Sequence, residues 1–225
     1  MSQRALFLAI EGIDGSGKGT QAAKLCKRLT DEGKSVALFS FPRYSETLFG
    51  KLVGEFLNGA YGTLEQVHPQ LVSLLFAGDR FESRDLLHAA LQNNDVVVCD
   101  RYVPSNVAHQ ASKRTGTERA ELTRRILQIE YEVFALPRPD LVLLLDMPAE
   151  SAQQLVAKKS ARTYTTQVAD IQEADTGYLQ GFREVYLELA RNEPNWQIIS
   201  GCVNERLRSV DEIGSDLWKT VSQRL

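Results

Sequence analysis

The chain has 225 residues, a net charge of −3 and a pI near 5.7. Its hydrophobic share of 43% and charged share of 24% are ordinary for a globular protein and exclude fibrous, collagen-like and disordered classes. Lys and Arg number 26 against 29 Asp and Glu, so the chain lacks the basic surplus of proteins that coat nucleic acid.

Short apolar runs alternate with longer helical patterns, and no linker or repeat divides the chain. The predicted strands are residues 5–10, 36–41, 96–99, 141–145 and 197–199. Between them, one helical pattern spans 20–32 and stops at Gly33, and a long one runs from 69 to 93. Capping boxes at 63–66 and 209–212 predict two helix starts. This alternation predicts a single α/β domain over 1–225. Its three layers (αβα) are a five-stranded parallel sheet with helices on both faces.

A candidate phosphate-binding loop directly follows the first predicted strand. Residues 12–20 match G-x-x-x-x-G-K in its required context of strand, loop and helix. Glycines let backbone N–H groups turn toward phosphate oxygens, and the lysine reaches the outer phosphates. The predicted ATP-binding residues are Gly12, Ile13, Asp14, Gly15, Ser16, Gly17, Lys18, Gly19 and Thr20. Because Gly19 replaces the usual Ser or Thr, we expect magnesium to be held by waters and a distant carboxylate.

Two predicted strands end in an aspartate, Asp100 and Asp146. At the carboxyl edge of a parallel sheet such a side chain can hold nucleotide-bound Mg²⁺, often through water. It can equally cap the following helix, and we favour that role for Asp146. Asp100 is the predicted magnesium residue.

Basic and aromatic side chains follow the same strands. Arg43 and Arg101 come after the second and third strands, where arginine can grip phosphate in a bidentate manner. Phe76 and Arg80, spaced i, i+4, share a helix face and could contact a base, although a core Phe beside a surface Arg has the same spacing. Residues 158–175 begin with Lys158, Lys159 and Arg162 and are predicted to be a lid over phosphates; a solvated loop is the alternative.

The three cysteines, Cys26, Cys99 and Cys202, form no C-x-x-C pair or Cys/His cluster. This spacing predicts free thiols in a reducing compartment rather than a zinc site or a disulfide framework. The longest apolar run near the N-terminus, residues 5–10, is too short for a signal peptide or a membrane span. We therefore expect a cytoplasmic protein without a membrane or nucleic-acid partner.

Several stretches together resemble a thymidylate kinase, a nucleoside monophosphate kinase with a phosphate-binding loop. They are residues 10–18, 41–44, 75–80, 100–106 and 136–140, with weaker matches at 172–175 and 182–186. The resemblance implies phosphoryl transfer from ATP·Mg²⁺ to dTMP, a five-stranded parallel sheet and a homodimer. It also implies a monophosphate-binding region at about 41–110.

The resemblance assigns roles to individual residues. It places Asp14 near the acceptor phosphate and the sugar 3′-hydroxyl, and Asp14 joins Asp100 as a predicted magnesium residue. Phe76 would stack on thymine and Arg80 would bond a thymine carbonyl. The implied dTMP-binding residues are Asp14, Phe41, Pro42, Arg43, Tyr44, Phe76, Arg80, Arg101, Ser105, Asn106 and Gln110. The implied catalytic residues are Lys18, Asp14, Arg101 and Arg162.

The chain departs from the family pattern at three places. Gly19-Thr20 is more similar to adenylate kinases, and His109 stands where the family often has tyrosine. Gly15 occupies a position where some members carry a catalytic arginine. In that respect the chain resembles the bacterial type that supplies this arginine from the lid, and Arg162 is then the candidate.

Other functions remain open at this stage. The chain could be another nucleoside monophosphate kinase of the adenylate or uridylate type, a deoxynucleoside kinase, or a regulatory module that binds nucleotide without catalysis. A nucleoside acceptor carries no phosphate, so it would give Arg43 and Arg101 less reason to converge. A GTP-dependent switch is disfavoured, since no Asn/Thr-Lys-x-Asp stretch occurs.

Overall fold

A computed structural model describes residues 4–63, 66–157, 176–204 and 206–225. In chain order, its elements are β1 (Leu6–Glu11), α1 (Lys18–Asp31), β2 (Val36–Ser40), α2 (Leu48–Leu57), α3 (Pro69–Glu82), α4 (Arg84–Asn93), β3 (Val96–Asp100), α5 (Val103–Ala111), α6 (Gly116–Gln128), the π-helical turn η1 (Ile129–Val133), β4 (Leu141–Asp146), α7 (Ala149–Ala157), α8 (Thr176–Asn192), β5 (Trp196–Ser200), β6 (Cys202–Val203), β7 (Arg206–Leu207) and α9 (Val210–Ser222).

The main sheet has five parallel strands in the order β2-β3-β1-β4-β5. All five lie within one or two residues of the predicted strands, and the expected fold class is confirmed. β1 and β4 are almost wholly buried, as expected for strands covered by helices on both faces. Because every strand runs the same way, the segments that follow them meet at one edge of the sheet, where ligands bind in such folds.

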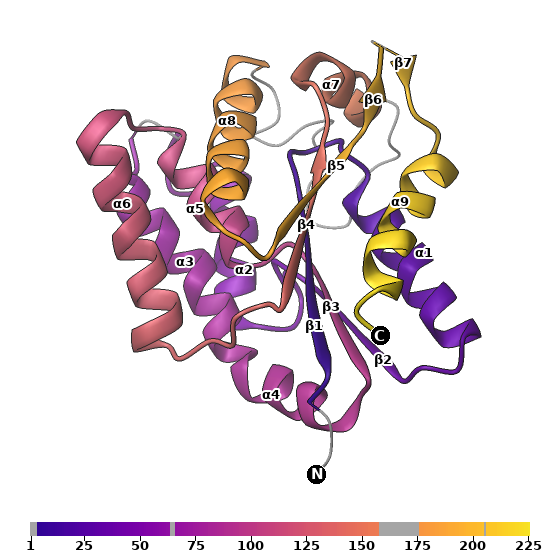
Figure 1. The fold of residues 1–225 in the computed structure, drawn as a ribbon. Coiled ribbons are helices and arrows are strands. Elements are labelled where there is room, and N and C mark those ends of the chain that lie inside the picture. Colours follow the sequence, from indigo (N-terminus) through magenta and orange to yellow (C-terminus); the bar gives the residue numbers. More distant parts are fainter. Residues whose placement is uncertain (1–3, 64–65, 158–175, 205) are drawn as a thin grey trace.

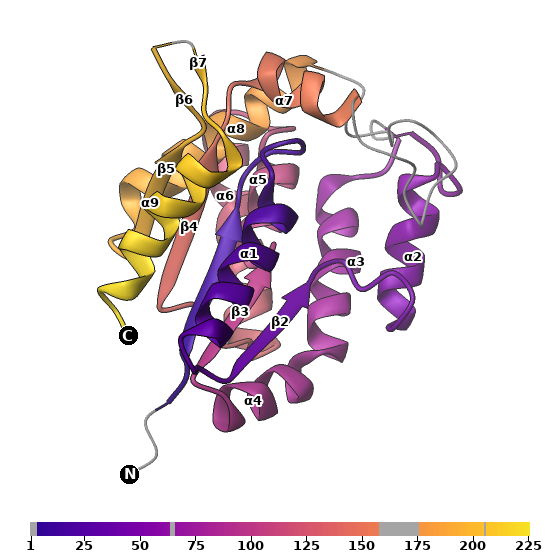
Figure 2. The same ribbon diagram turned by 90° about the vertical axis from the view of Figure 1, so that its right-hand side faces the viewer.

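Successive side chains of each strand point to opposite faces of the sheet. Leu8 and Ile10 of β1 pack against α1 and α9, which lie to the right of the sheet in Figure 1. Phe7 and Ala9 face the other side and pack with side chains of α4 and α5. On that side α2 pairs with α3, around a small apolar cluster of its own (Figure 2).

The structure corrects the predicted helix boundaries in the middle of the chain. The predicted helix start at 63–66 is wrong: Gln66 N donates to the Thr63 carbonyl at 3.1 Å, but α3 begins only at Pro69, with the His68 side chain as its cap. Proline fits the first helical position, since it lacks the N–H that would be unpaired there. The predicted helix over 69–93 is also divided, with α3 ending at Glu82 and α4 beginning at Arg84. The capping box at Ser209 and Glu212 is confirmed.

The three cysteines are free, as predicted. Across the described ranges, no helix combines the length and apolar character needed to cross a lipid bilayer.

Candidate active site

The loop between β1 and α1 wraps tightly against the neighbouring helix α7. Gly15 has a φ of +85°, and a Cβ built on it would lie 2.1 Å from the carbonyl oxygen of Ala152 in α7. Gly17 has a similar φ of +87°, but a Cβ there would meet no atom within 4 Å. The contact with α7 therefore leaves no room for a side chain at Gly15, and an arginine cannot be carried at that position.

This pair of glycines gives a test of the loop's packing. Gly17→Ala should lower the free energy of unfolding by about 1–2 kcal/mol, because an L-residue is strained at positive φ. Gly15→Ala should cost roughly 1–3 kcal/mol more, since the added methyl also collides with the α7 backbone. Urea titration of both variants measures the difference. An equal decrease in the free energy of unfolding for both variants would mean that α7 can move away from residue 15 without an energetic cost.

Lys18 opens α1 and is buried, with 6% of its surface exposed. Its Nζ donates to the Ile13 carbonyl at 2.8 Å, so the ammonium lies over the loop. Burial lowers the pKa of Lys18 to about 8, and the charge of Arg101 acts in the same direction, whereas Asp14 and Asp100 oppose it. A phosphate beside this amine would favour its charged form.

Arg101 links the loop to the segment after β3. Its guanidinium forms an ion pair with Asp14 in the loop and donates to Ser105 Oγ at 3.3 Å. Desolvation opposes its charge, but Asp14, Asp100 and Glu11 outweigh this and raise the pKa of Arg101. Its φ of 67° is unusual for a residue with a side chain, and such strain is often kept at functional sites. The structure thus brings together two residues, 87 positions apart, that the sequence assigned to one site.

Glu11 is a further component of this cluster that the sequence analysis missed. It is fully buried at the end of β1, where its carboxylate accepts from Tyr102 N at 2.7 Å, Ser105 Oγ at 2.6 Å and Tyr186 Oη at 2.7 Å. Burial raises the pKa of Glu11, although these hydrogen bonds and Arg101 work against that rise. The signal in the sequence was a charged residue ending an apolar strand. Glu11 thus holds in place the segment that follows Arg101.

The two aspartates that end strands have different surroundings. The Asp146 carboxylate binds Arg183 of α8 at 2.6 and 3.0 Å, so it forms a structural ion pair and not the helix cap that we favoured. Asp100 faces the start of α1, since a Cβ built on Gly19 would lie 3.1 Å from its Oδ2. Among the described residues, no group of three His, Cys, Asp or Glu is arranged to hold a metal. Any magnesium here would therefore depend on Asp100, waters and phosphate oxygens.

The segment after β2 has residues both at the surface and in the core. The Phe41 ring is buried against Tyr102, with centroids 6.1 Å apart, and the peptide before Pro42 is cis. Arg43 pairs with Glu46 and donates to Ser83 Oγ at 3.3 Å, while its backbone N–H bonds Asp79 at 3.0 Å. These contacts leave Arg43 partly exposed at the edge of the sheet, whereas Phe41 has a packing role.

Phe76 and Arg80 both lie on α3, as their spacing predicted, but their surroundings differ. Phe76 is half-buried and packs against the α2–α3 cluster, as Tyr44 also does. Arg80 is buried and forms two 2.6 Å bonds with Glu130. It is therefore not the surface arginine that the alternative interpretation required.

Polar atoms without partners mark the same region. Within the described ranges, four buried side-chain atoms have no hydrogen-bond partner: Ser16 Oγ, Gln21 Oε1, Asn106 Oδ1 and Gln110 Nε2. Three of the four belong to residues that the sequence assigned to ATP or dTMP binding. Because buried polar groups are rarely left unpaired, such atoms indicate where a polar ligand would bind.

His109 stands where the resemblance described above led us to expect a tyrosine. Its Nδ1 lies 2.8 Å from Tyr178 Oη, and its ring centroid is 3.8 Å from that of Phe182. Burial, with Arg101 and Lys113 in support, holds the pKa of His109 well below its usual value. His109 is therefore a neutral residue that packs against α8.

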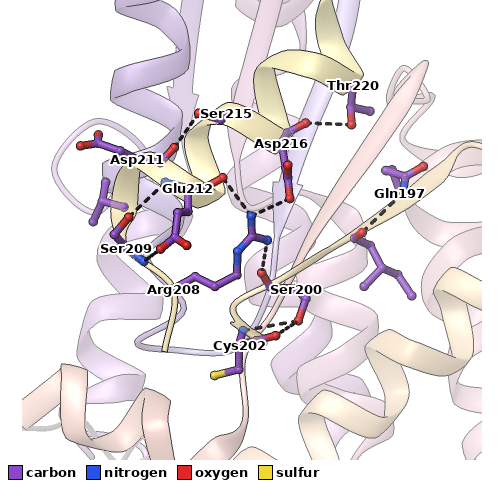
Figure 3. A network of polar contacts seen from close by, with 12 residues as sticks. Gln197, Ser200, Cys202, Arg208, Ser209, Asp211, Glu212, Ser215, Asp216 and Thr220 are labelled. Carbon is purple, nitrogen blue, oxygen red and sulfur yellow. Dashed lines mark hydrogen bonds and ion pairs between the residues drawn. The ribbon is translucent and has the colours of Figure 1, made fainter. Parts of the chain in front are cut away.

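Figure 3 shows a network of polar contacts around Arg208, between the segment after β5 and α9. Arg208 follows the β6–β7 hairpin and donates to Ser200 O at 2.9 Å, to Glu212 O at 3.0 Å and to Asp216 Oδ2 at 2.7 Å. These bonds tie the end of β5 to α9. The hairpin itself was not predicted.

The predicted lid, with Lys158, Lys159 and Arg162, lies outside the described residues. Its role as a lid and the catalytic role of Arg162 stay predictions.

Comparisons with known proteins agree on one family. The sequence model described as thymidylate kinase matches residues 10–210. A probable thymidylate kinase of Thermococcus onnurineus is 32% identical over 98% of both chains. A thymidylate kinase of Mycobacterium tuberculosis is 33% identical over 82% of this chain and 86% of that protein. The solved thymidylate kinase of Candida albicans has a similar fold, with a TM-score of 0.77 and 24% identity over 100% of this chain and 94% of that one.

Proposed function

The chain belongs to the thymidylate kinase family, and from this premise we propose that it transfers the γ-phosphoryl group of ATP to dTMP, yielding ADP and dTDP. The observation that carries the proposal is the ion pair between Asp14 and Arg101. It joins the loop suited to the phosphates of the donor to the segment suited to the phosphate of the acceptor.

Catalysis of phosphoryl transfer depends mainly on positioning and on electrostatic stabilisation of charge on the migrating group. In the proposed site, Lys18 and the loop N–H groups bind the donor phosphates. Arg43 and Arg101 bind the acceptor phosphate, and Asp14 orients Arg101 beside it. Phe76 offers a ring face to the base, next to Arg80 and Asn106.

Magnesium fits this arrangement. Asp100 offers a hard oxygen ligand at the carboxyl edge of the sheet, and Gly19, which has no side chain, leaves space beside it. When bound, the ion neutralises charge on the β- and γ-phosphates. Asp14 is the less suitable of the two predicted ligands, because its carboxylate already pairs with Arg101.

Two further expectations belong to the same proposal. Exposed leucines on α3, Leu71 and Leu74, are compatible with the homodimer that the family resemblance implied. The free cysteines are compatible with a cytoplasmic location.

A panel of acceptors with ATP·Mg²⁺ tests the function. We expect dTMP to be the best acceptor, dUMP to be weaker because it lacks the methyl contact, and dCMP and AMP to be poor. An arginine can only donate, so an amino group in place of a carbonyl should cost roughly 5- to 150-fold in kcat/KM. Phe76→Ala should lower kcat/KM for all pyrimidine monophosphates. Arg80→Ala should instead reduce the difference in kcat/KM between dTMP and dCMP. If AMP were the best acceptor, the resemblance of Gly19-Thr20 to adenylate kinases would be the better guide to the substrate. Binding of ATP without phosphorylation of any acceptor would indicate a regulatory module.

A further inference from the structure

The most deeply buried ion pair next to the proposed base site is formed by Arg80 and Glu130. Their side chains are 2% and 0% exposed. Arg80 Nε lies 2.6 Å from Oε2, and Arg80 Nη2 lies 2.6 Å from Oε1. This bidentate geometry fixes the plane of the guanidinium. Glu130 does not bond the third nitrogen, Nη1. Because the plane of the guanidinium is fixed, the direction of the Nη1 N–H groups is fixed as well.

Glu130 reaches Arg80 from a distorted helical turn. It belongs to η1, a π-helical turn that continues α6 and contacts α3. Such turns are rare and occur frequently at functional sites. A buried ion pair is by itself weak evidence for stabilisation, because desolvation of two charges offsets much of their attraction. The cost of burying Glu130 therefore suggests a function beyond holding the helices together.

The same carboxylate also orients Asn106 on α5. Asn106 Nδ2 lies 2.9 Å from Ser73 O and 2.7 Å from Glu130 Oε1. Both neighbours are acceptors, so the atom between them must be the NH₂ group of the amide. The amide oxygen consequently points away from them. This oxygen is buried and has no hydrogen-bond partner in the part of the chain that the structure describes.

These groups lie on facing parts of α3 and α5. Ser73, Phe76 and Arg80 are spaced three and four residues apart, so they share the face of α3 that meets α5 at Asn106. Together they offer a base one aromatic ring, a fixed donor on Arg80 and a fixed acceptor on Asn106. Thymine needs both: its O4 accepts and its N3–H donates. Cytosine has the reverse pattern, with an amino donor at C4 and an acceptor at N3.

We infer that Glu130 is a positioning residue that sets the preference for thymine over cytosine. It does so by aiming the free donor of Arg80 and the free acceptor of Asn106 at the base. This inference rests on the proposed function. Glu130 itself does not touch the base, so its effect passes through these two side chains.

Glu130→Gln is the direct test, because it keeps the shape but replaces one acceptor with a donor. That donor must face an N–H of Arg80 or the NH₂ of Asn106, and the Asn106 amide can then turn over. We expect the ratio of kcat/KM for dTMP to that for dCMP to fall at least about tenfold, mainly through KM for dTMP. The KM for ATP should stay within about twofold. Glu132→Gln, an exposed residue of the same turn, is the matched control and should leave the ratio unchanged.

A merely structural role for Glu130 would give a different result. The melting temperature and the turnover of all acceptors would then fall together, and the dTMP:dCMP ratio would stay constant, which would overturn the inference. If Glu130→Gln does not fold, Glu130→Asp is the second variant, because it retains the charge on a shorter side chain. We expect the dTMP:dCMP ratio of kcat/KM to fall in this variant too, but by less. An unchanged ratio in Glu130→Asp would equally contradict the inference.

A measurement on the wild-type protein is independent of both variants. In ¹⁵N-labelled protein without nucleotide, the Arg80 Nε–H and the Asn106 Nδ2 protons should exchange slowly with solvent, and rapid exchange of both would overturn the inference. Wild-type protein that fails to phosphorylate dTMP would instead contradict the proposed function, so the two failures are distinguishable.

Discussion

Lys18→Ala should lower kcat by about 10²–10³-fold or more while the protein keeps its fold. The amine is the cation of the phosphate-binding loop, and its bonding partner is the loop carbonyl of Ile13 rather than an acidic side chain. Burial disfavours its charge, as the lowered pKa shows, so its removal relieves a desolvation cost and should leave the melting temperature nearly unchanged. Circular dichroism and ADP release on the purified variant measure the two effects.

Lys24→Ala is the matched control, because Lys24 lies on the same helix but pairs with Asp211 at the surface. Its turnover should equal that of the wild type. Near-normal turnover of Lys18→Ala would show that this loop does not bind the donor phosphates.

The same lysine predicts a pH dependence. With a pKa of about 8, Lys18 loses its charge as the pH rises through that value, so kcat/KM for ATP should decline above pH 8. Lys113 also has a pKa lowered to about 8, by burial and by Arg114. The decline should therefore persist in Lys113→Met. Its disappearance there would assign the titration to Lys113 instead.

Arg162→Ala should lower kcat by about 10²–10³-fold, and far more than it raises the KM for dTMP. The reason is that Arg162 is the predicted source of positive charge at the transition state. Gly15 cannot carry an arginine, because α7 lies 2.1 Å from where its Cβ would be. Arg43, Arg101 and Arg183 already pair with carboxylates. Rapid-quench or steady-state kinetics with saturating ATP separate the two parameters.

Lys159→Ala serves as the comparison within the same basic segment and should have a much smaller effect. If KM rises in Arg162→Ala while kcat holds, Arg162 binds substrate instead, and Lys158 and Lys159 become the next candidates for catalysis.

Local signals carried the prediction of the phosphate-binding loop and the sheet. The apolar runs at 5–10, 96–99 and 141–145 are buried strands, whereas the run at 36–41 is a strand that is only partly buried. The order of strands with helices between them leaves few topologies. The loop motif acts through backbone geometry, which depends on glycine positions within nine residues. For this reason Gly12, Gly17 and Lys18 have in the structure the places that the motif predicts. The error at 63–66 arose because Thr63 and Gln66 match a capping box. The break at Ser83 was missed because no Gly or Pro marks it in the sequence.

Side-chain partners across long sequence distances could not be predicted in this way. Asp146 was expected to cap a helix but binds Arg183, and the pairing of Arg80 with Glu130 was not foreseen in either interpretation of Arg80. Each of these pairs forms only when helices pack against each other or against the sheet.

The sequence by itself therefore determined the fold class, the geometry of the candidate phosphate-binding loop and the family, because these depend on local periodicity and on short motifs. Only the tertiary structure decided which carboxylate faces which arginine. Buried charges are costly unless they are paired, and the helices that bring the partners together are placed by the whole core. Glu11 and Glu130, both fully buried and bonded to residues on other elements, show this most clearly.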